Sequence, residues 1–243
     1  MSARTVLLES PKYSSSGYES ISREQSREVN MITIIDYGMG NLRSVQKAFE
    51  KFCSDVIVSS SANGILKADK IVLPGVGAFK VAMDELKKRG LIDMIKRSIE
   101  KGKPFLGICL GLQLLFSESE ECSPRFAGEA GKKIKGLDII KGKVKRFKEK
   151  DGLKIPHMGW NQIRAAGGGR RAAILNGVKN GSYMYFAHSY YVAPEDRGVI
   201  LCKTNYGGNF TSGVHRDNVY GLQFHPEKSQ SAGLKIIKNF VQL

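Results

Sequence analysis

The sequence predicts an α/β domain with a mostly parallel central sheet, helices on both of its faces and an antiparallel extension. Two observations support this fold class. Short apolar, β-branched runs alternate with amphipathic segments from Met31 to about Ser117, a pattern typical of a parallel sheet covered on both faces. From about residue 137 the chain carries short strand patterns separated by glycine-rich turns, which favours antiparallel pairing. The length of 243 residues fits one such domain.

The first half of the predicted domain alternates strands with helices. Strands are expected where apolar and β-branched residues run together, at Ile32–Asp36, Asp55–Val58, Lys70–Leu73 and Pro104–Cys109. Helices are expected where apolar residues recur at helical spacing, at Leu42–Phe52, Ala78–Arg89, Leu91–Lys101 and Leu110–Ser117. In this order the helices serve as crossovers between parallel strands.

The second half is predicted to be mainly extended. Strand patterns recur at residues 137–147, 153–163, 183–192, 199–204 and 219–224, and a final helix is expected at about Ser229–Val241. No internal repeat and no linker interrupt the chain after residue 31. We therefore expect residues 31–243 to form one domain.

The first thirty residues differ from the rest of the chain. Met1–Asn30 contains eight serines, almost no apolar periodicity, and four basic residues balanced by four glutamates. A transit peptide is poor in acidic residues and a secretory signal has an apolar core, so neither pattern fits. We interpret residues 1–30 as a disordered leader, or as a mis-assigned start with Met31 as the true first residue.

The composition excludes several classes of protein. An apolar fraction of 42% argues against a disordered chain, and no apolar run approaches the ~20 residues of a membrane-spanning helix. The four cysteines have no zinc-ligand spacing and are too few for a disulfide scaffold. We expect a cytoplasmic protein that uses neither a metal nor a cofactor.

The net charge of +15 is unusual, and it makes a basic nucleic-acid-binding protein the remote alternative. The densest cluster is Lys132–Lys154, with ten basic residues against three acidic ones. Phe147 is its only aromatic residue, whereas single-strand binders interleave stacking side chains with their basic residues. The cluster is either a solvated basic face or a surface that attracts phosphates or an acidic partner.

The segment Pro104–Gln113 has the pattern of a nucleophile elbow. A strand runs into a helix, and Cys109 lies between Gly107 and Gly111 at the turn. Such a turn holds the sulfur at the carboxyl edge of the sheet, where open α/β sheets bind ligands, and the helix N-terminus favours the thiolate. We therefore predict Cys109 as a nucleophile. The other cysteines have no such setting and are interpreted as structural: Cys53, Cys122 and Cys202.

A thiolate nucleophile needs a proton-transfer partner and a group that orients it. His225 and Glu227 lie two residues apart at the end of a predicted strand, so their side chains can share a face. Pro226 restricts the backbone between them. We predict that His225 exchanges a proton with Cys109 and that Glu227 fixes its tautomer.

Two glycine-rich turns follow predicted strands. Pro74–Phe79 opens a helix, so its backbone N–H groups can hold a phosphate or a developing oxyanion. Gly38–Asn41 resembles the start of a dinucleotide fingerprint, but Arg43 stands where the third glycine belongs. We therefore predict only a tight turn there and no dinucleotide cofactor.

The elbow around Cys109 and the His225–Glu227 pair resemble the hallmark motifs of the class I (triad) glutamine amidotransferases. Four further segments are similar to those of glutaminase subunits of imidazole glycerol phosphate synthases, namely residues 35–44, 74–79, 157–161 and 185–190. The resemblance runs from Met31 to the C-terminus. It implies a class I amidotransferase-like (flavodoxin-like) fold.

The resemblance also implies an activity, the hydrolysis of glutamine to glutamate and ammonia by a Cys109–His225–Glu227 triad. It implies an oxyanion hole formed by the backbone N–H groups of Val76 and Leu110, with a rearrangement at Gly75–Gly77. The positions that correspond to glutamine-binding residues are Gly75, Gly77, Gln113, Ser189 and Tyr190.

The implied partner is a (β/α)8 cyclase in a heterodimer. Ammonia would pass through a tunnel to this cyclase, which forms imidazole glycerol phosphate and an aminoimidazole carboxamide ribotide in histidine biosynthesis. Four residues match interface positions, and each also has a structural interpretation: Asn41 as a helix start, Trp160 and Tyr185 as core aromatics, and Lys228 as a surface charge. His157, His188 and His215 are interpreted as structural only.

Two connectors, Cys122–Lys135 and Ala165–Arg171, have a basic or glycine-rich composition that the resemblance does not account for. They leave the acceptor enzyme open. The alternative is therefore a glutaminase subunit of a sugar-amidating synthase in surface-polysaccharide biosynthesis.

Overall fold

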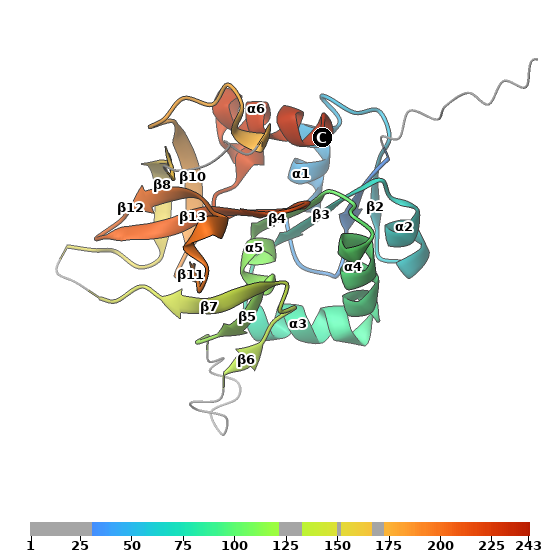
Figure 1. Ribbon diagram of the computed structural model, residues 1–243, viewed down its shortest axis with the longest axis horizontal. Coiled ribbons are helices and arrows are strands. Elements are labelled where there is room, and N and C mark those ends of the chain that lie inside the picture. The colour runs from blue at the N-terminus through green and yellow to red at the C-terminus, as the bar shows by residue number, and fades with distance from the viewer. Residues whose placement is uncertain (1–30, 122–132, 150–151, 167–172) are drawn as a thin grey trace, which may run out of the picture.

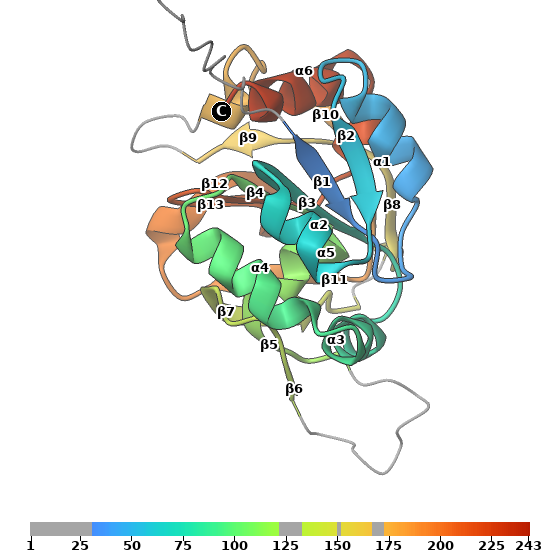
Figure 2. The same cartoon turned by 90° about the vertical axis from the view of Figure 1, so that its right-hand side faces the viewer.

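The computed structural model describes residues 31–121, 133–149, 152–166 and 173–243. The predicted leader at residues 1–30 lies outside this part of the chain, as do Cys122 and most of both connectors. Within the described ranges the chain forms one large mixed sheet, a separate two-stranded sheet and helices on both faces (Figures 1 and 2). The predicted α/β fold with an antiparallel extension is confirmed.

Five neighbouring strands form the parallel part of the large sheet. Their order is β2, β1, β3, β4 and β14, and each runs parallel to its neighbours. Their bounds are β1 Ile32–Ile35, β2 Val56–Ser59, β3 Lys70–Gly75, β4 Phe105–Cys109 and β14 Val219–Leu222. The carboxyl ends of β3 and β4 meet where Gly75 pairs with Cys109.

The sheet continues from β14 through mainly antiparallel pairs. The order is β13, β11, β7, β5 and β6, of which only β7 and β5 run parallel to each other. Their bounds are β5 Phe116–Ser119, β6 Ile134–Lys135, β7 Ile140–Arg146, β11 Tyr190–Pro194 and β13 Asn209–Arg216. Strand β12 Ile200–Asn205 also pairs with β13, and β9 Arg164–Ala165 pairs with the other edge of β12. The separate sheet pairs β8 His157–Gln162 with β10 Tyr183–His188.

Helices cover both faces of the parallel part. On one face lie α1 Leu42–Phe49 and α6 Gln230–Val241, and on the other lie α2 Ala62–Lys67, α3 Phe79–Lys88, α4 Leu91–Glu100 and α5 Leu110–Leu114 (Figure 1). Side chains alternate between the two cores, since Ile34 packs with α1 and α6 whereas Ile35 packs on the other face. Short 3-10 turns in the described part of the chain include η2 Ala173–Leu175, η3 Arg197–Val199 and η4 Pro226–Lys228. Among the described residues no helix is long and apolar enough to cross a membrane.

The structure corrects the prediction that a helix runs over Leu110–Ser117. Helix α5 ends at Leu114, and Phe116 begins strand β5. The backbone N–H groups of Leu137 and Ile139 donate to the carbonyls of Leu114 and Leu115 at 2.8 and 2.9 Å. The carbonyls at the helix end therefore bond to a distant segment instead of to a further helical turn.

The other differences concern short or polar elements. The predicted strand over residues 183–192 is two strands, β10 and β11, separated at Ser189. Helix α2 has only six residues, too few for an apolar period to be visible. Strand β13 was not predicted because its buried positions include Thr211 and Ser212 in place of an apolar run.

Candidate active site

The turn from β4 into α5 holds Cys109 in an uncommon backbone conformation. Its φ is 54° and its ψ is −107°, in a region that residues with a Cβ rarely occupy. The next turn of the helix packs directly on the sheet because two positions lack a Cβ. A Cβ on Gly107 would lie 2.6 Å from the Gly111 carbonyl oxygen, and a Cβ on Gly111 would overlap the Leu73 carbonyl. The predicted elbow is thus present.

The Cys109 thiol is buried among polar groups from distant strands. The side-chain Nε2 of Gln223 donates to Cys109 Sγ at 3.7 Å, and Sγ lies 3.9 Å from the Ala187 carbonyl oxygen. Gln113 Nε2 donates to Gln223 Oε1 at 3.2 Å. The two glutamine amides therefore form a buried support beneath the sulfur.

His225 and Glu227 form a buried pair beside Cys109. His225 Nδ1 lies 2.8 Å from Glu227 Oε1, and their side chains are 6% and 2% exposed. Burial lowers the pKa of His225, but hydrogen bonds to Cys109 and Glu227, with their negative charges, outweigh burial and raise the pKa to about 10. These neighbours therefore favour the charged imidazolium, which can give up a proton.

The backbone of His225 is also fixed. Its N–H donates to the Tyr185 carbonyl at 2.9 Å, and its carbonyl accepts the Ser229 hydroxyl at 2.6 Å. Ser229 Oγ in turn accepts the Tyr185 N–H at 3.0 Å. Strand β10 and the start of α6 thus fix the backbone of His225 and keep its imidazole beside Cys109.

A cavity of about 330 Å³ opens over these groups. Its walls include most of the predicted catalytic, oxyanion and glutamine-binding residues: Val76, Gly77, Cys109, Leu110, Gln113, Ser189, Tyr190 and His225. Gly75 lies behind this wall, against the Tyr37 hydroxyl, and Glu227 lies behind His225. The structure therefore brings segments from four parts of the chain to one pocket of a size that suits a small molecule.

Five pocket residues were missed from the sequence: Glu121, Pro156, Met158, Ala187 and His188. Glu121 is the informative one, because it is the only acidic residue among the described residues that line the pocket. Its Oε2 accepts the N–H of Phe79 at 2.9 Å, at the start of α3, and burial raises its pKa. Glu121 reaches the pocket because the chain leaves α5 as strand β5 and not as a longer helix. No local sequence pattern indicates that Glu121 lines a pocket.

Three of the four predicted interface residues cluster beside the pocket. The ring centroids of Trp160 and Tyr185 are 6.0 Å apart, and Lys228 Nζ lies 5.6 Å from the centre of the Tyr185 ring. Lys228 also lines the pocket. Asn41 lies outside the pocket wall and caps α1, its Oδ1 accepting the Ser44 N–H at 3.3 Å.

In the described part of the Lys132–Lys154 cluster, four of the eight basic residues lie within 4 Å of an acidic side chain, namely Lys133, Lys141, Lys143 and Arg146. Lys133 and Lys143 both contact Glu118, at 2.8 and 3.2 Å, and Lys141 contacts Asp138 at 2.7 Å. These pairs are exposed and salt-screened. They favour the interpretation of this cluster as a solvated face. Lys132, Lys150 and Asp151 lie outside the described residues.

The sequence comparisons identify the family to which this site belongs. The family model described as "Glutamine amidotransferase class-I" matches residues 33–243. The chain belongs to the class I glutamine amidotransferases. The predicted enzyme class is thereby confirmed.

Curated relatives also align with most of this class I amidotransferase. It is 52% identical over 215 residues to a protein of Syntrophotalea carbinolica, covering 86% of this chain and 98% of the relative. It is 49% identical over 213 residues to one of Methanocaldococcus jannaschii, covering 88% and 100%. Both are named "Imidazole glycerol phosphate synthase subunit HisH".

Solved structures agree on the amidotransferase fold. A chain described as glutamine amidotransferase aligns with a TM-score of 0.64 at 15% identity, covering 88% of this chain and 100% of that one. A chain of PurLQS from Thermotoga maritima aligns with a TM-score of 0.63 at 18% identity, covering 87% and 97%. At such identities the likeness concerns the fold alone.

Proposed function

We propose that this protein is the glutaminase subunit of an imidazole glycerol phosphate synthase, which hydrolyses glutamine and passes the ammonia to a (β/α)8 cyclase in the cytoplasm. The observation that carries the proposal is that Cys109 and His225 line one pocket, with Glu227 bonded to His225 behind its wall. Relatives about half identical to this chain over nearly their whole length bear the name of that subunit.

The proposed chemistry begins with attack of the Cys109 thiolate on the glutamine carboxamide carbon. The carbonyl electrons move to oxygen, and the His225 imidazolium gives its proton to the leaving nitrogen, which departs as ammonia. The neutral imidazole then removes a proton from water, whose oxygen attacks the thioester. Collapse of this second intermediate expels the thiolate and releases glutamate, and the ion pair is restored.

We propose that the backbone N–H groups of Val76 and Leu110 stabilise the oxyanion of both intermediates. Both residues line the pocket, on either side of the point where Gly75 pairs with Cys109. One such donor typically contributes about 3 kcal/mol to transition-state stabilisation.

Glutamine recognition is proposed to combine one charge with several polar contacts. Substrate glutamine carries an α-ammonium group, and Glu121 is the one carboxylate among the pocket residues described. An ammonium group next to this partly buried acid would favour its ionised form. Gln113, Ser189 and Tyr190 then contact the remainder of the substrate, with the Gly75–Gly77 turn beneath its carboxamide.

The surface beside the pocket supports a docked partner. Met158, Trp160 and Tyr183 are 64%, 46% and 57% exposed, and all belong to the separate sheet formed by β8 and β10. Contiguous exposed apolar side chains mark interaction sites. Since ammonium ions in water are not nucleophiles, direct transfer at such an interface keeps ammonia neutral. Trp160, Tyr185, Lys228 and Asn41 are the proposed contact residues.

The proposal is tested by reconstituting the complex with a candidate cyclase and comparing two nitrogen sources. Cys109→Ala should abolish glutamine-dependent synthesis and leave ammonia-dependent synthesis by the complex intact. The matched control is Cys202→Ala, a buried cysteine that does not line the pocket, which should retain both activities. Glutamine turnover by Cys109→Ala would contradict the mechanism, whereas stimulation only by a sugar-amidating synthase would contradict the choice of partner.

A further inference from the structure

We propose that two buried histidines, His157 and His188, and the half-buried Asn161 form a positioning network that fixes the glutamine-binding wall at Tyr190 and Gln113. The inference rests on the proposed glutaminase function and assigns these side chains a role in it. It extends the structural interpretation that the sequence gives to the two histidines.

The network is a continuous chain of short contacts. Asn161 Nδ2 lies 3.2 Å from His157 Nε2, and His157 Nδ1 lies 3.0 Å from His188 Nε2. His188 Nδ1 lies 2.7 Å from the Tyr190 carbonyl oxygen. The same carbonyl accepts a hydrogen bond from Gln113 Nε2 at 3.1 Å. A line of hydrogen bonds thus runs from β8 to the support beneath the Cys109 sulfur.

The network ends at the Tyr190 carbonyl oxygen, and this acceptor determines which atom is the donor in every hydrogen bond of the network. A carbonyl oxygen only accepts, so His188 Nδ1 must carry the proton that points at Tyr190. His188 Nε2 is then the acceptor for the Nδ1 proton of His157. His157 Nε2 in turn accepts from the Asn161 amide. Asn161 Oδ1 accepts the Gln162 N–H at 2.8 Å, which agrees with this orientation of the amide.

The surroundings keep both imidazoles neutral and aligned. The His157 ring stacks between Phe186 and Tyr206, at centroid distances of 4.8 and 3.8 Å, and the His188 ring packs against Phe147. Burial lowers the pKa of His157 to about 4 and that of His188 to about 3. A proton added to either ring would set two donors against each other. The network therefore has one stable arrangement at neutral pH.

This arrangement acts on the pocket through Tyr190. Its carbonyl is held by His188 and serves as the anchor for Gln113, which lines the pocket and supports Gln223 beneath the sulfur. His188 itself lies in the pocket wall. Loss of the His188 donor would leave this carbonyl with one partner fewer and allow Tyr190 and Gln113 to move.

The spectroscopic test measures the tautomers directly in the full chain. Long-range ¹H–¹⁵N spectra of the imidazoles between pH 6 and 9 should show both His157 and His188 with a protonated Nδ1 and an unprotonated Nε2. In Asn161→Asp, a carboxylate facing His157 should move the His157 proton to Nε2. A protonated Nε2 on either histidine of the unchanged protein would overturn the network.

The functional test separates the hydrogen bond from ring packing. His188→Phe keeps an aromatic ring but lacks the donor, whereas His188→Asn offers an amide N–H in place of Nδ1. The KM for glutamine should rise about tenfold in His188→Phe, the effect of one lost buried hydrogen bond. In His188→Asn it should return to within about threefold of the unchanged protein. Ammonia-dependent synthesis by the complex should change in neither.

The matched control is His215→Phe, because His215 donates to the Asp217 carbonyl outside the pocket and its loss should leave the KM unchanged. Equal KM values for His188→Phe and the unchanged protein would overturn the positioning role. A wild-type protein that hydrolyses no glutamine would contradict the proposed function instead, and the tautomers would then still decide the network.

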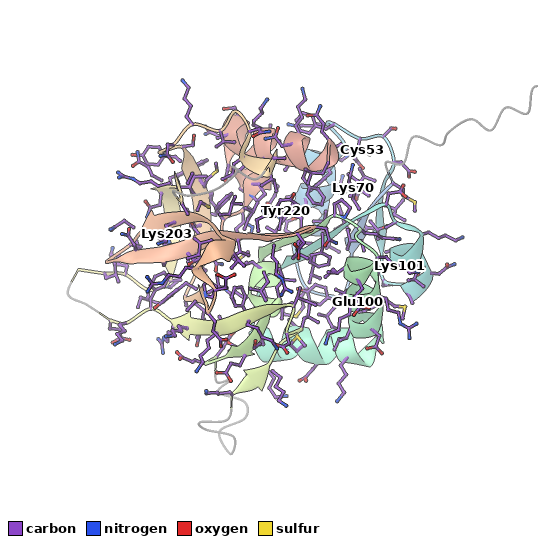
Figure 3. All side chains as sticks on the ribbon, in the orientation of Figure 1. Cys53, Lys70, Glu100, Lys101, Lys203 and Tyr220 are labelled. Atoms are coloured by element: carbon purple, nitrogen blue, oxygen red, sulfur yellow. The ribbon has the colours of Figure 1, made fainter. Side chains whose placement is uncertain are left out.

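A second and independent observation concerns a different cavity, of about 650 Å³. Three cationic side chains from separate elements line it: Arg164 on β9, Arg197 on η3 and Lys203 on β12. Figure 3 shows Lys203 on the opposite side of the molecule from Glu100 and Lys101. No acidic residue lines the cavity among the residues described, and its other polar residues are Asn161, Gln162, Asn205 and Asn209.

We infer that this basic cavity binds a small phosphorylated molecule. The three cationic residues are exposed, and no described acidic residue shares the wall with them, so the cavity favours an anion. The Asn161 amide already contacts His157 and Asn205, but other amides of the wall, such as that of Gln162, can donate to phosphate oxygens. The concave shape and the volume suit a small ligand better than the surface of a protein.

The test is calorimetric titration of the full chain with ribose 5-phosphate and, separately, with inorganic phosphate. Combined Arg164→Gln, Arg197→Gln and Lys203→Gln should weaken binding of both probes at least tenfold. The matched control removes the same number of charges from helices on the other side, with Arg97→Gln, Lys67→Gln and Lys87→Gln, and should bind normally. Equal weakening in both variants, or no binding of either probe to the unchanged protein, would overturn the inference. Weaker binding of the cyclase without phosphate binding would identify a partner surface and overturn it as well.

Discussion

The two walls of the active-site pocket are built differently. The wall formed by β3, β4 and α5 is held by backbone geometry, through the positive φ of Cys109 and the direct packing of Gly111 on Leu73. The opposite wall, between β10 and β11, is held by side chains, through His188 and Gln113 at the Tyr190 carbonyl. We expect damage to the first wall to affect chemistry or folding, and damage to the second to affect substrate affinity.

The largest expected effect concerns His225, whose imidazolium is paired with Glu227. Glu227→Gln removes the carboxylate and favours the wrong tautomer, so kcat for glutamine should fall by about 10³–10⁴-fold. The matched control, Glu121→Gln, removes a carboxylate from the other side of the pocket and should act mainly on KM. Steady-state glutaminase assays of the complex decide this, and a kcat within tenfold of the unchanged protein would remove Glu227 from the mechanism.

The same pair predicts how stability depends on pH. The pKa of His225 is raised from an unfolded value near 6.5 to about 10, so its stabilising proton is fully present below about pH 6.5. That contribution is lost as the pH rises through about 10. The stability gap between the unchanged protein and Glu227→Gln should therefore shrink from pH 6 to pH 10.5 in urea denaturation. If the difference in unfolding free energy instead grew with pH, the pKa of His225 would not be raised by Glu227.

A backbone-held wall should tolerate no added atom. In Gly111→Ala the new Cβ would overlap the buried Leu73 carbonyl, so the free energy of unfolding should fall by about 3 kcal/mol. Gly90→Ala is the control, because its Cβ meets nothing within 4 Å and only its φ of +66° opposes the change, at about 1 kcal/mol. Equal losses in urea denaturation would mean that close packing does not hold this wall.

The difference between the walls also explains what the sequence could predict. Cys109 could be predicted as a site candidate because the strand, glycines and helix are adjacent in the chain. His225 and Glu227 could be predicted because they follow one strand. Glu121 and His188 were missed because they reach the pocket only through pairing of distant strands. The buried polar positions Thr211 and Ser212 concealed β13 in the same way. The Ser212 hydroxyl is satisfied by Thr204 and Cys202 on the neighbouring strand, which no local sequence pattern indicates.

A smaller loss of stability is expected at Gly75, which begins the Gly75–Gly77 turn. A Cβ on Gly75 would overlap the hydroxyl of Tyr37, which is buried and has no hydrogen-bond partner among the described residues. Gly75→Ala should cost about 2 kcal/mol of stability, and most of that should be recovered in the double variant with Tyr37→Phe. Additive losses in the urea double-mutant cycle would show that the two groups do not meet.

The smallest effect distinguishes the two interpretations of Asn41. As the N-cap of α1, Asn41→Ala should lower the free energy of unfolding by about 1 kcal/mol, whereas Asn41→Ser should keep the cap. Neither change lies in the pocket wall, so the glutaminase activity of the isolated chain should be unchanged in both. If Asn41→Ser, with its cap intact, still weakens binding of the cyclase in a titration, then Asn41 also contacts the partner. If only the alanine variant is affected, and only in its stability, the residue serves the helix alone.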